Sequence, residues 1–198
     1  VTNTVTITVL PTPSAIAITS APSSICAGGV ATLVATGGSI PVAQTILSEN
    51  FNAGIGTFTS TTLSSSAPQN WAPQVNGYSY SFTPHTGSVS GFMMANSDVG
   101  GSGSTANTQL ISPSFSTVGF NNLSLNFKEY LNNSNTAAAV EISDNNFVTS
   151  TILRNNFTSD IGTASVFNNS TLAIPESFNN KANVKIRFRF ESAWGYWW

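Results

Sequence analysis

Apolar and polar residues alternate along much of the chain. At its start, VTNTVTITV places Val5, Ile7 and Val9 on one side and threonines on the other. The segment VKIRFRFE (184–191) alternates in the same way, with Val, Ile and Phe on one side and Lys, Arg and Glu on the other. A period of two with β-branched residues is typical of a strand that has one buried face. Both segments are therefore predicted to be half-buried strands.

The same pattern recurs in shorter segments that are separated by turn residues. Pro11 and Pro13, Gly28–Gly29 and Gly37–Gly38 interrupt it near the start of the chain, where proline and glycine favour turns. Further strands are predicted at 15–19, 30–36, 123–127 and 138–143. No stretch of ten or more residues has a helical period. The chain is therefore predicted to be all-β, with a two-sheet sandwich or jelly roll whose core the 13 phenylalanines supply.

The composition narrows the classes of partner. Lys and Arg total 6, Asp and Glu total 8, and the formal net charge is -2. This balance offers no basic patch to a nucleic acid or an anionic membrane. No apolar run approaches the roughly 18 residues of a transmembrane helix. A charge-poor, Ser/Thr/Asn-rich β-protein is typical of secreted surface proteins, so an extracellular, cell-surface location is expected.

The sequence contains little that would support catalysis. His85 is the sole histidine and lies in TPHTG, a turn-like context in which we expect an exposed loop residue, and no nucleophile elbow accompanies it. The eight acids lie in no recognisable glycosidase motif. One His and one Cys make zinc binding improbable. The chain is therefore not expected to be an enzyme.

The chain ends in WGYWW, residues 194–198, which raises the question of an aromatic binding platform. Trp197 and Trp198 are adjacent, so in a strand they point to opposite faces. At least one is expected to pack into the sandwich, and the other to cover an edge or line a shallow site. The segment is therefore interpreted as the start of a core strand.

Eight short blocks of the sequence carry a resemblance to a known family. They are SENFNAG (48–54), NW (70–71), FMMANSD (92–98), LISPSFS (110–116), LSLNFKEY (123–130), VEIS (140–143), VKIRFRF (184–190) and WGYWW (194–198). In order and spacing they resemble the cleaved-adhesin and MAM-like jelly rolls found in surface proteins of Bacteroidetes. The resemblance implies a jelly roll over residues 46–198 that lacks its final strand.

The first part of the chain is similar to immunoglobulin-like or PKD-like repeats of the same adhesins. Residues 1–13 resemble the last strand of one repeat and its linker, and residues 14–45 the first strands of the next. The resemblance implies that the jelly roll is inserted into that repeat. Cys26 is the only cysteine, so it is either a small buried apolar residue or paired with a cysteine outside this segment. The resemblance implies a disulfide partner beyond residue 198. The whole arrangement is similar to gliding-motility adhesins exported by type IX secretion.

In the resembled jelly rolls a structural calcium lies where the first strand meets the last. Matched block by block, the resemblance implies Glu49, Asn52 and Asp98 as ligands, and Ca²⁺ takes such oxygen ligands. The alternative is that Glu49 and Asp98 are ordinary surface acids.

Two classes of function remain open. The chain is expected to be a non-catalytic segment of a large bacterial cell-surface adhesin that attaches to an external surface or polysaccharide and serves gliding motility. The alternative is a carbohydrate-binding module of a secreted multidomain enzyme. Exposed coplanar aromatic rings on a concave sheet face would favour sugar binding, and burial of those rings would favour the adhesin.

Overall fold

The computed structural model describes residues 2–11, 14–21, 24, 30–38, 42–64, 70–133, 137–155 and 157–198. The described chain is almost entirely β, which confirms the predicted all-β class. Its strands are β1 (Thr2–Pro11), β2 (Ala17–Ala21), β3 (Thr32–Thr36), β4 (Gln44–Glu49), β5 (Thr59–Thr62), β6 (Ala72–Gln74), β7 (Ser79–Tyr80), β8 (Thr83–Pro84), β9 (Phe92–Met94), β10 (Thr105–Ile111), β11 (Phe120–Glu129), β12 (Ala139–Ser143), β13 (Thr151–Arg154), β14 (Asn168–Ala173) and β15 (Lys185–Ala193). Two short 3-10 helices, η1 (Asp98–Gly100) and η2 (Glu176–Phe178), complete the elements. No helix among the described residues is long and apolar enough to cross a membrane.

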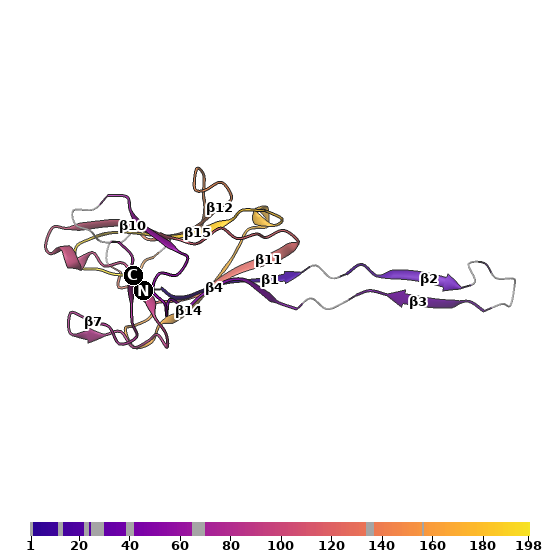
Figure 1. Ribbon diagram of the computed structural model, residues 1–198, viewed down its shortest axis with the longest axis horizontal. Helices are drawn as coiled ribbons and strands as arrows, with labels where there is room; N and C mark the ends of the chain where they lie inside the picture. Colours follow the sequence, from indigo (N-terminus) through magenta and orange to yellow (C-terminus); the bar gives the residue numbers. More distant parts are fainter. Residues whose placement is uncertain are drawn as a thin grey trace.

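Two antiparallel sheets form a sandwich. The first has the order β14-β11-β1-β9-β6, with β4 also paired to β1, and the second has the order β13-β12-β15-β10-β5. The two layers are seen nearly edge-on in Figure 1, with β10, β12 and β15 in one and β1, β11 and β14 in the other. The core between them is continuous and contains residues of both sheets.

The alternation seen in the sequence decides which residues enter this core. In β15, Ile186, Phe188 and Phe190 are fully buried, while the basic residues between them are partly exposed. Arg187 donates through Nε to Glu141 on the neighbouring strand β12, at 2.6 Å. The basic stripe of β15 is thus paired across the sheet, which supports its interpretation as a sheet face.

Strand β1 lies in the middle of the first sheet. It pairs antiparallel with β11 over Thr2 to Pro11 and with β4 over Val5 to Val9. Val5, Ile7 and Val9 are completely buried in the main core. The sequence analysis assigned residues 1–13 to a preceding repeat and began the jelly roll at residue 46. That assignment is wrong for β1, because this strand belongs to the sandwich. Alternation shows that a strand buries one face, but it does not show which sheet covers that face.

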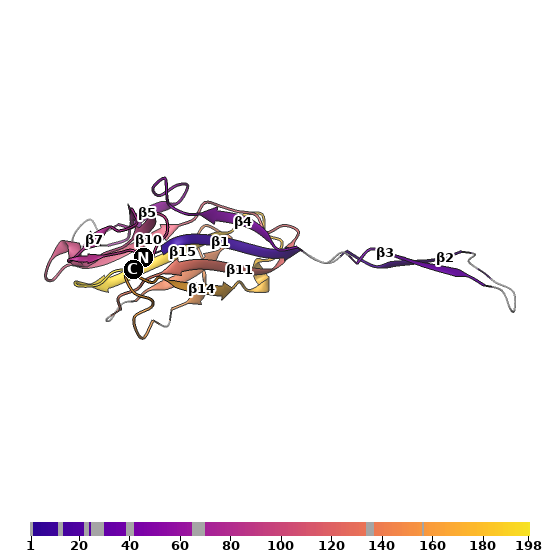
Figure 2. The same cartoon turned by 90° about the horizontal axis from the view of Figure 1, so that it is seen from below.

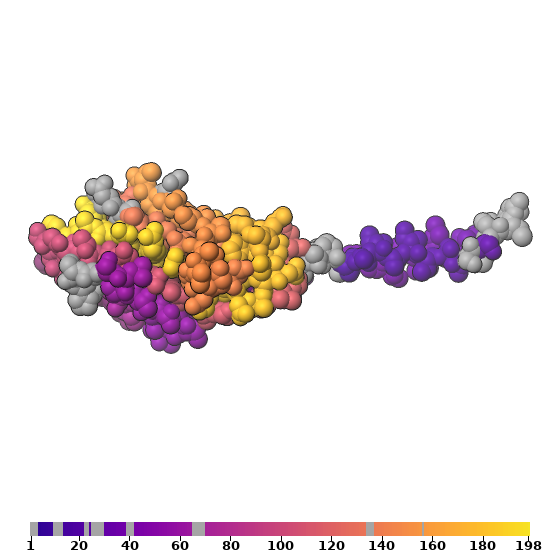
Figure 3. All heavy atoms as spheres, turned by 90° about the horizontal axis from the view of Figure 1, so that it is seen from above, coloured from indigo at the N-terminus to yellow at the C-terminus, as the bar shows by residue number. Residues whose placement is uncertain are grey.

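Residues 14–21 and 30–38, which we call the arm, stand out from one end of the sandwich (Figures 1 and 2). In the arm β2 pairs antiparallel with β3, and every residue of both strands is exposed. Figure 3 shows that no other segment lies over the visible face of the arm. The assignment of residues 14–45 to the first strands of an Ig-like repeat stays a prediction. Cys26 lies outside the described residues.

Candidate functional site

The aromatic end of the chain divides between two sides of the first sheet. Trp198 is completely buried in the main core, with its ring centroid 5.6 Å from that of Trp71 and 5.2 Å from that of Phe157. Trp197 packs instead with aromatic residues on the opposite side of the sheet. The prediction that at least one tryptophan packs into the sandwich is therefore confirmed.

Trp198 also contacts a buried ion pair. Its indole Nε1 donates to Glu129 Oε2 at 2.9 Å, and Ser170 Oγ donates to the other carboxylate oxygen. Arg154 Nη2 lies 2.6 and 2.7 Å from the two carboxylate oxygens of Glu129, which is completely buried. A buried carboxylate with this many donors is satisfied by its partners. We assign this pair to the stability of the sandwich.

The guanidinium of Arg154 is held by aromatic rings as well as by charge. It lies 4.6 Å from the ring centroid of Phe157 and 5.3 Å from that of Phe127. The side chain of Arg154 remains 20% exposed, whereas that of Glu129 is not exposed. Arg154 therefore reaches water at its edge while it neutralises the carboxylate beneath it.

The residues around Trp197 form what we call the outer aromatic cluster: Tyr78, Tyr80, His85, Phe92, Met94, Tyr130, Phe167 and Trp197. Met93 points into the main core, so its neighbours Phe92 and Met94 point to the other side of β9. The loop that carries β7 and β8 covers them, and backbone N–H groups of Thr86 and Gly87 bind the carbonyl of Ala164. The cluster is thus a second, smaller core beneath this loop.

His85 lies at the centre of this cluster and is completely buried. The prediction of an exposed loop histidine is therefore wrong. His85 directly follows strand β8 in the hairpin of β7 and β8, and its backbone N–H donates to the carbonyl of Tyr78 at 2.8 Å. Burial lowers the pKa of the imidazole below its usual 6.5, because the low-dielectric surroundings disfavour the charged form.

The three residues expected to bind calcium are engaged separately. Glu49 Oε1 accepts from the backbone N–H groups of Asn50 and Phe51, at 3.0 and 2.9 Å. Asn52 Oδ1 accepts from the N–H of Gly91 at 2.8 Å. Asp98 Oδ2 accepts from the hydroxyl of Tyr80 at 2.9 Å. Burial and this hydrogen bond raise the pKa of Tyr80 to about 12.

The sheet register keeps Asp98 away from the other two. Glu49 is opposite Val5 of β1, whereas Met93, five residues before Asp98, is opposite Thr2, and β9 runs onward away from Val5. At about 3.3 Å per residue, Asp98 lies on the order of 15 Å or more from Glu49 along the sheet. Ca²⁺ ligands lie within about 2.6 Å of the ion, so the three residues do not form one cage. The described residues contain no group of three or more His, Cys, Asp and Glu side chains that could hold a metal, and calcium binding stays a prediction.

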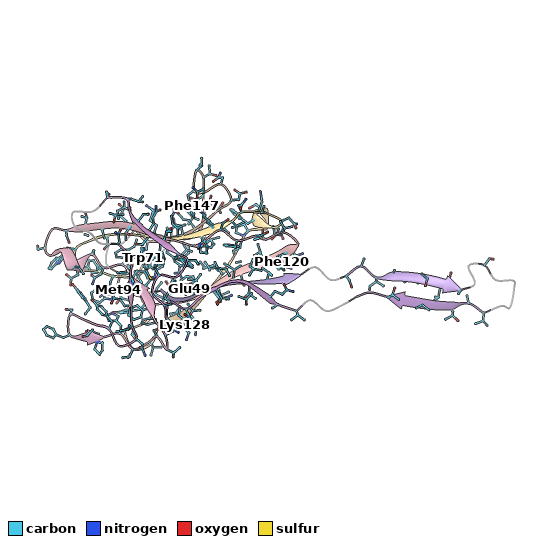
Figure 4. All side chains as sticks on the ribbon, viewed as in Figure 1. Glu49, Trp71, Met94, Phe120, Lys128 and Phe147 are labelled. Atoms are coloured by element: carbon cyan, nitrogen blue, oxygen red, sulfur yellow. The ribbon has the colours of Figure 1, made fainter. Side chains whose placement is uncertain are left out.

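A surface hollow lies beside the outer aromatic cluster. Its volume is about 240 Å³, and Asn70, Gln74, Tyr78, Met94 and Asn96 contribute to its lining. Met94 and Trp71 lie in the half of the sandwich that is farther from the arm (Figure 4). Amides beside an aromatic ring suit the hydroxyl groups and apolar faces of a sugar. Met94 and Asn96 belong to the block FMMANSD, but the sequence analysis selected only Asp98 of that block as a candidate site residue, and it selected none of the residues that line the hollow.

Most aromatic rings of the described chain are buried or partly buried. Trp71 and Trp198 are in the main core, and Trp197 and the tyrosines are partly covered. Phe82 is fully exposed and Trp194 is 45% exposed. These two do not belong to the same element, and neither lines the hollow. The described structure therefore presents no flat aromatic platform.

Comparisons with known proteins return no relative. No protein family, no curated protein and no solved structure matches the chain.

Proposed function

We propose that the chain is a non-catalytic module of a large bacterial cell-surface adhesin that attaches to an external surface or polysaccharide. Its extracellular location, its export by type IX secretion and its part in gliding motility rest on the resemblance of its sequence blocks to such adhesins. Burial of the aromatic rings supports this class over a sugar-binding platform. The observation that carries the proposal is the exposed apolar face of the arm.

The two faces of the arm differ in chemistry. Ile18 is opposite Ala35, and Ser20 is opposite Leu33, so Ile18 and Leu33 share one face. They are 68% and 70% exposed. The other face carries Thr19 opposite Val34, with Thr32 and Thr36 of β3 opposite alanines of β2.

Such an arm gains from contact with another surface. An isolated two-stranded hairpin is marginally stable in water, and exposed apolar side chains gain about 25 cal/mol for each Å² removed from water. A protruding hairpin also reaches a surface before the sandwich does. An attachment element is the role that this geometry suits.

Bead retention under flow tests the proposal. Beads coated with the intact chain should be retained on an apolar-coated or polysaccharide-coated slide several-fold more than beads coated with an unrelated protein. Ile18→Thr with Leu33→Thr should remove most of that difference, because threonine keeps the β propensity but not the apolar face. Val34→Thr on the other face is the matched control. Equal retention of the double variant and the control would show that the apolar face of the arm does not mediate attachment.

The hollow beside the outer aromatic cluster supports the second candidate, a carbohydrate-binding module. A glycan array with the intact chain tests it. Binding that Gln74→Ala abolishes and Asn169→Ala leaves intact would favour this candidate, because Gln74 lines the hollow and Asn169 is exposed on β14. An array with no bound glycan would exclude it for the sugars displayed.

A further inference from the structure

The arm is a closed hairpin whose two long edges are open. At its base the N–H of Gly38 donates to the carbonyl of Ser14 at 3.3 Å, and in the described structure β2 and β3 pair only with each other. No other described segment lies along either edge (Figures 1 and 2). In an antiparallel pair, every second residue directs its backbone N–H and C=O away from the neighbouring strand. Each edge of the arm can therefore accept a further strand.

The arm lacks the features that usually prevent such pairing. Residues 14–38 contain no charged side chain, the register of β2 with β3 has no bulge, and neither strand contains a proline. Native proteins protect exposed edges with charges, prolines or bulges, because an open edge otherwise pairs with another chain. A two-stranded hairpin is also marginally stable in water, whereas three or more strands with an apolar face are stable. A further strand would therefore stabilise the arm.

The sequence of β3 is complementary to a second copy of itself. The strand is TLVAT, with Val34 at its centre. When two copies of β3 pair antiparallel about this residue, each Val34 is opposite the other. Leu33 is then opposite Ala35, and Thr32 is opposite Thr36. Thr–Thr pairs stabilise neighbouring strands, and the apolar pairs remove area from water.

The edge of β2 does not offer the same match. Its sequence is AITSA, and antiparallel pairing about Thr19 would put Ile18 opposite Ser20. An apolar side chain would then face a polar one in two of the pairs. The self-complementary edge of the arm is therefore that of β3.

Pairing through β3 also matches the two faces of the arm. The two-fold axis of such a pair is perpendicular to the sheet, so each face of one arm continues into the same face of the other. Ile18 and Leu33 of both copies then lie on one side of a four-stranded sheet. Each arm stands out from one end of its sandwich (Figure 2). Because the paired strands run in opposite directions, the two sandwiches lie at opposite ends of the joined arms and do not meet.

We propose that two copies of this chain dimerise through their arms, with the outer edges of their β3 strands paired antiparallel about Val34. A second copy is the partner because the edge is uncharged, unprotected and complementary to itself. The dimer presents the apolar faces of both arms side by side. This inference rests on the edge of β3 and is independent of the proposed adhesive function.

Light scattering after size-exclusion chromatography of the intact chain tests the proposal. The average mass of the parent should increase from one chain toward two as the concentration is raised. Val34→Lys should keep the mass at one chain, because two like charges would be opposite each other at the two-fold axis. Thr19→Lys is the matched control and should dimerise as the parent does. Thr19 is on the same face but on β2, so its two lysines would be three strand spacings apart, about 14 Å.

Charge complementation tests the register. Val34→Glu alone should be monomeric, and an equal mixture of Val34→Glu and Val34→Lys should dimerise, because the axis then brings opposite charges together. Val34 is 48% exposed and lies outside the core, so these variants should keep the melting temperature of the parent.

Three results would each overturn the proposal: a parent that stays at one chain at every concentration, a Val34→Lys chain that dimerises as the parent does, or a mixture that stays monomeric. Dimerisation that Ile18→Thr with Leu33→Thr abolishes and Val34→Lys leaves intact would also overturn it, because the contact would then use the apolar face. A monomeric parent whose beads are still retained on a slide would overturn the pairing and leave the proposed attachment intact.

Discussion

Replacing Arg154 by methionine tests the role assigned to the buried ion pair. Methionine keeps the length and much of the apolar contact with Phe127 and Phe157 but removes the charge. Glu129 would retain the hydrogen bonds from Trp198 and Ser170 and lose both contacts with the guanidinium. Its carboxylate would then be buried without a counter-charge.

The expected loss follows from this burial. Removing one partner of a buried ion pair costs about 3–5 kcal/mol, since the remaining charge is uncompensated. For a chain of 198 residues each kcal/mol corresponds to about 2–4 °C in melting temperature, so the drop should be about 6–20 °C. Glu129→Gln should cost less, because the arginine that it leaves is 20% exposed and reaches water.

A double-mutant cycle measures the coupling. Urea unfolding of the parent, Arg154→Met, Glu129→Gln and the double variant gives four free energies of unfolding. The double variant should be more stable than the sum of the two single losses predicts, by about 1 kcal/mol or more. The ion pair would not be a buried, stabilising one if Arg154→Met lost less than about 1 kcal/mol of unfolding free energy, or if the two single losses added up to the loss of the double variant. Either result is typical of an ion pair that is exposed to solvent.

Three further predictions concern single positions. Trp198→Ala should lower the free energy of unfolding by about 3–5 kcal/mol in urea titrations, and a loss near zero would contradict its place in the core. The pKa of the His85 imidazole is lower in the folded chain than in the unfolded chain, so the unfolded chain binds a proton there at higher pH. The contribution of neutral His85 to stability should therefore be complete above pH 6.5 and decrease as the pH falls below that value. The melting temperature of His85→Phe should decrease less than that of the parent when the pH is lowered through 6.5. An equal decrease in both would show that other groups cause the pH dependence. If calcium binds through Glu49, Ca²⁺ should raise the melting temperature of the parent and not of Glu49→Ala, and an equal rise in both would exclude Glu49 as a ligand.

The sequence was informative where a strand signal is local. The alternation in residues 184–191 and 123–127 requires only that neighbouring side chains point to opposite faces, and both segments are strands with the expected residues buried. His85 shows the limit of such reasoning. The local sequence TPHTG indicated an exposed turn, but His85 follows β8 directly, and its burial depends on where this hairpin lies against Tyr130 and Trp197, which are far away in the chain.

The sequence by itself determined the all-β class, the apolar and polar faces of the main strands and the opposite directions of Trp197 and Trp198. All three follow from the period of two in the pattern of apolar and polar residues. Only the tertiary structure decided that β1 belongs to the sandwich, that Glu129, Arg154 and Trp198 meet, and that His85 is buried. The reason is that strand pairing joins residues far apart in the chain, and many pairings satisfy the same alternation until one closed core excludes the others.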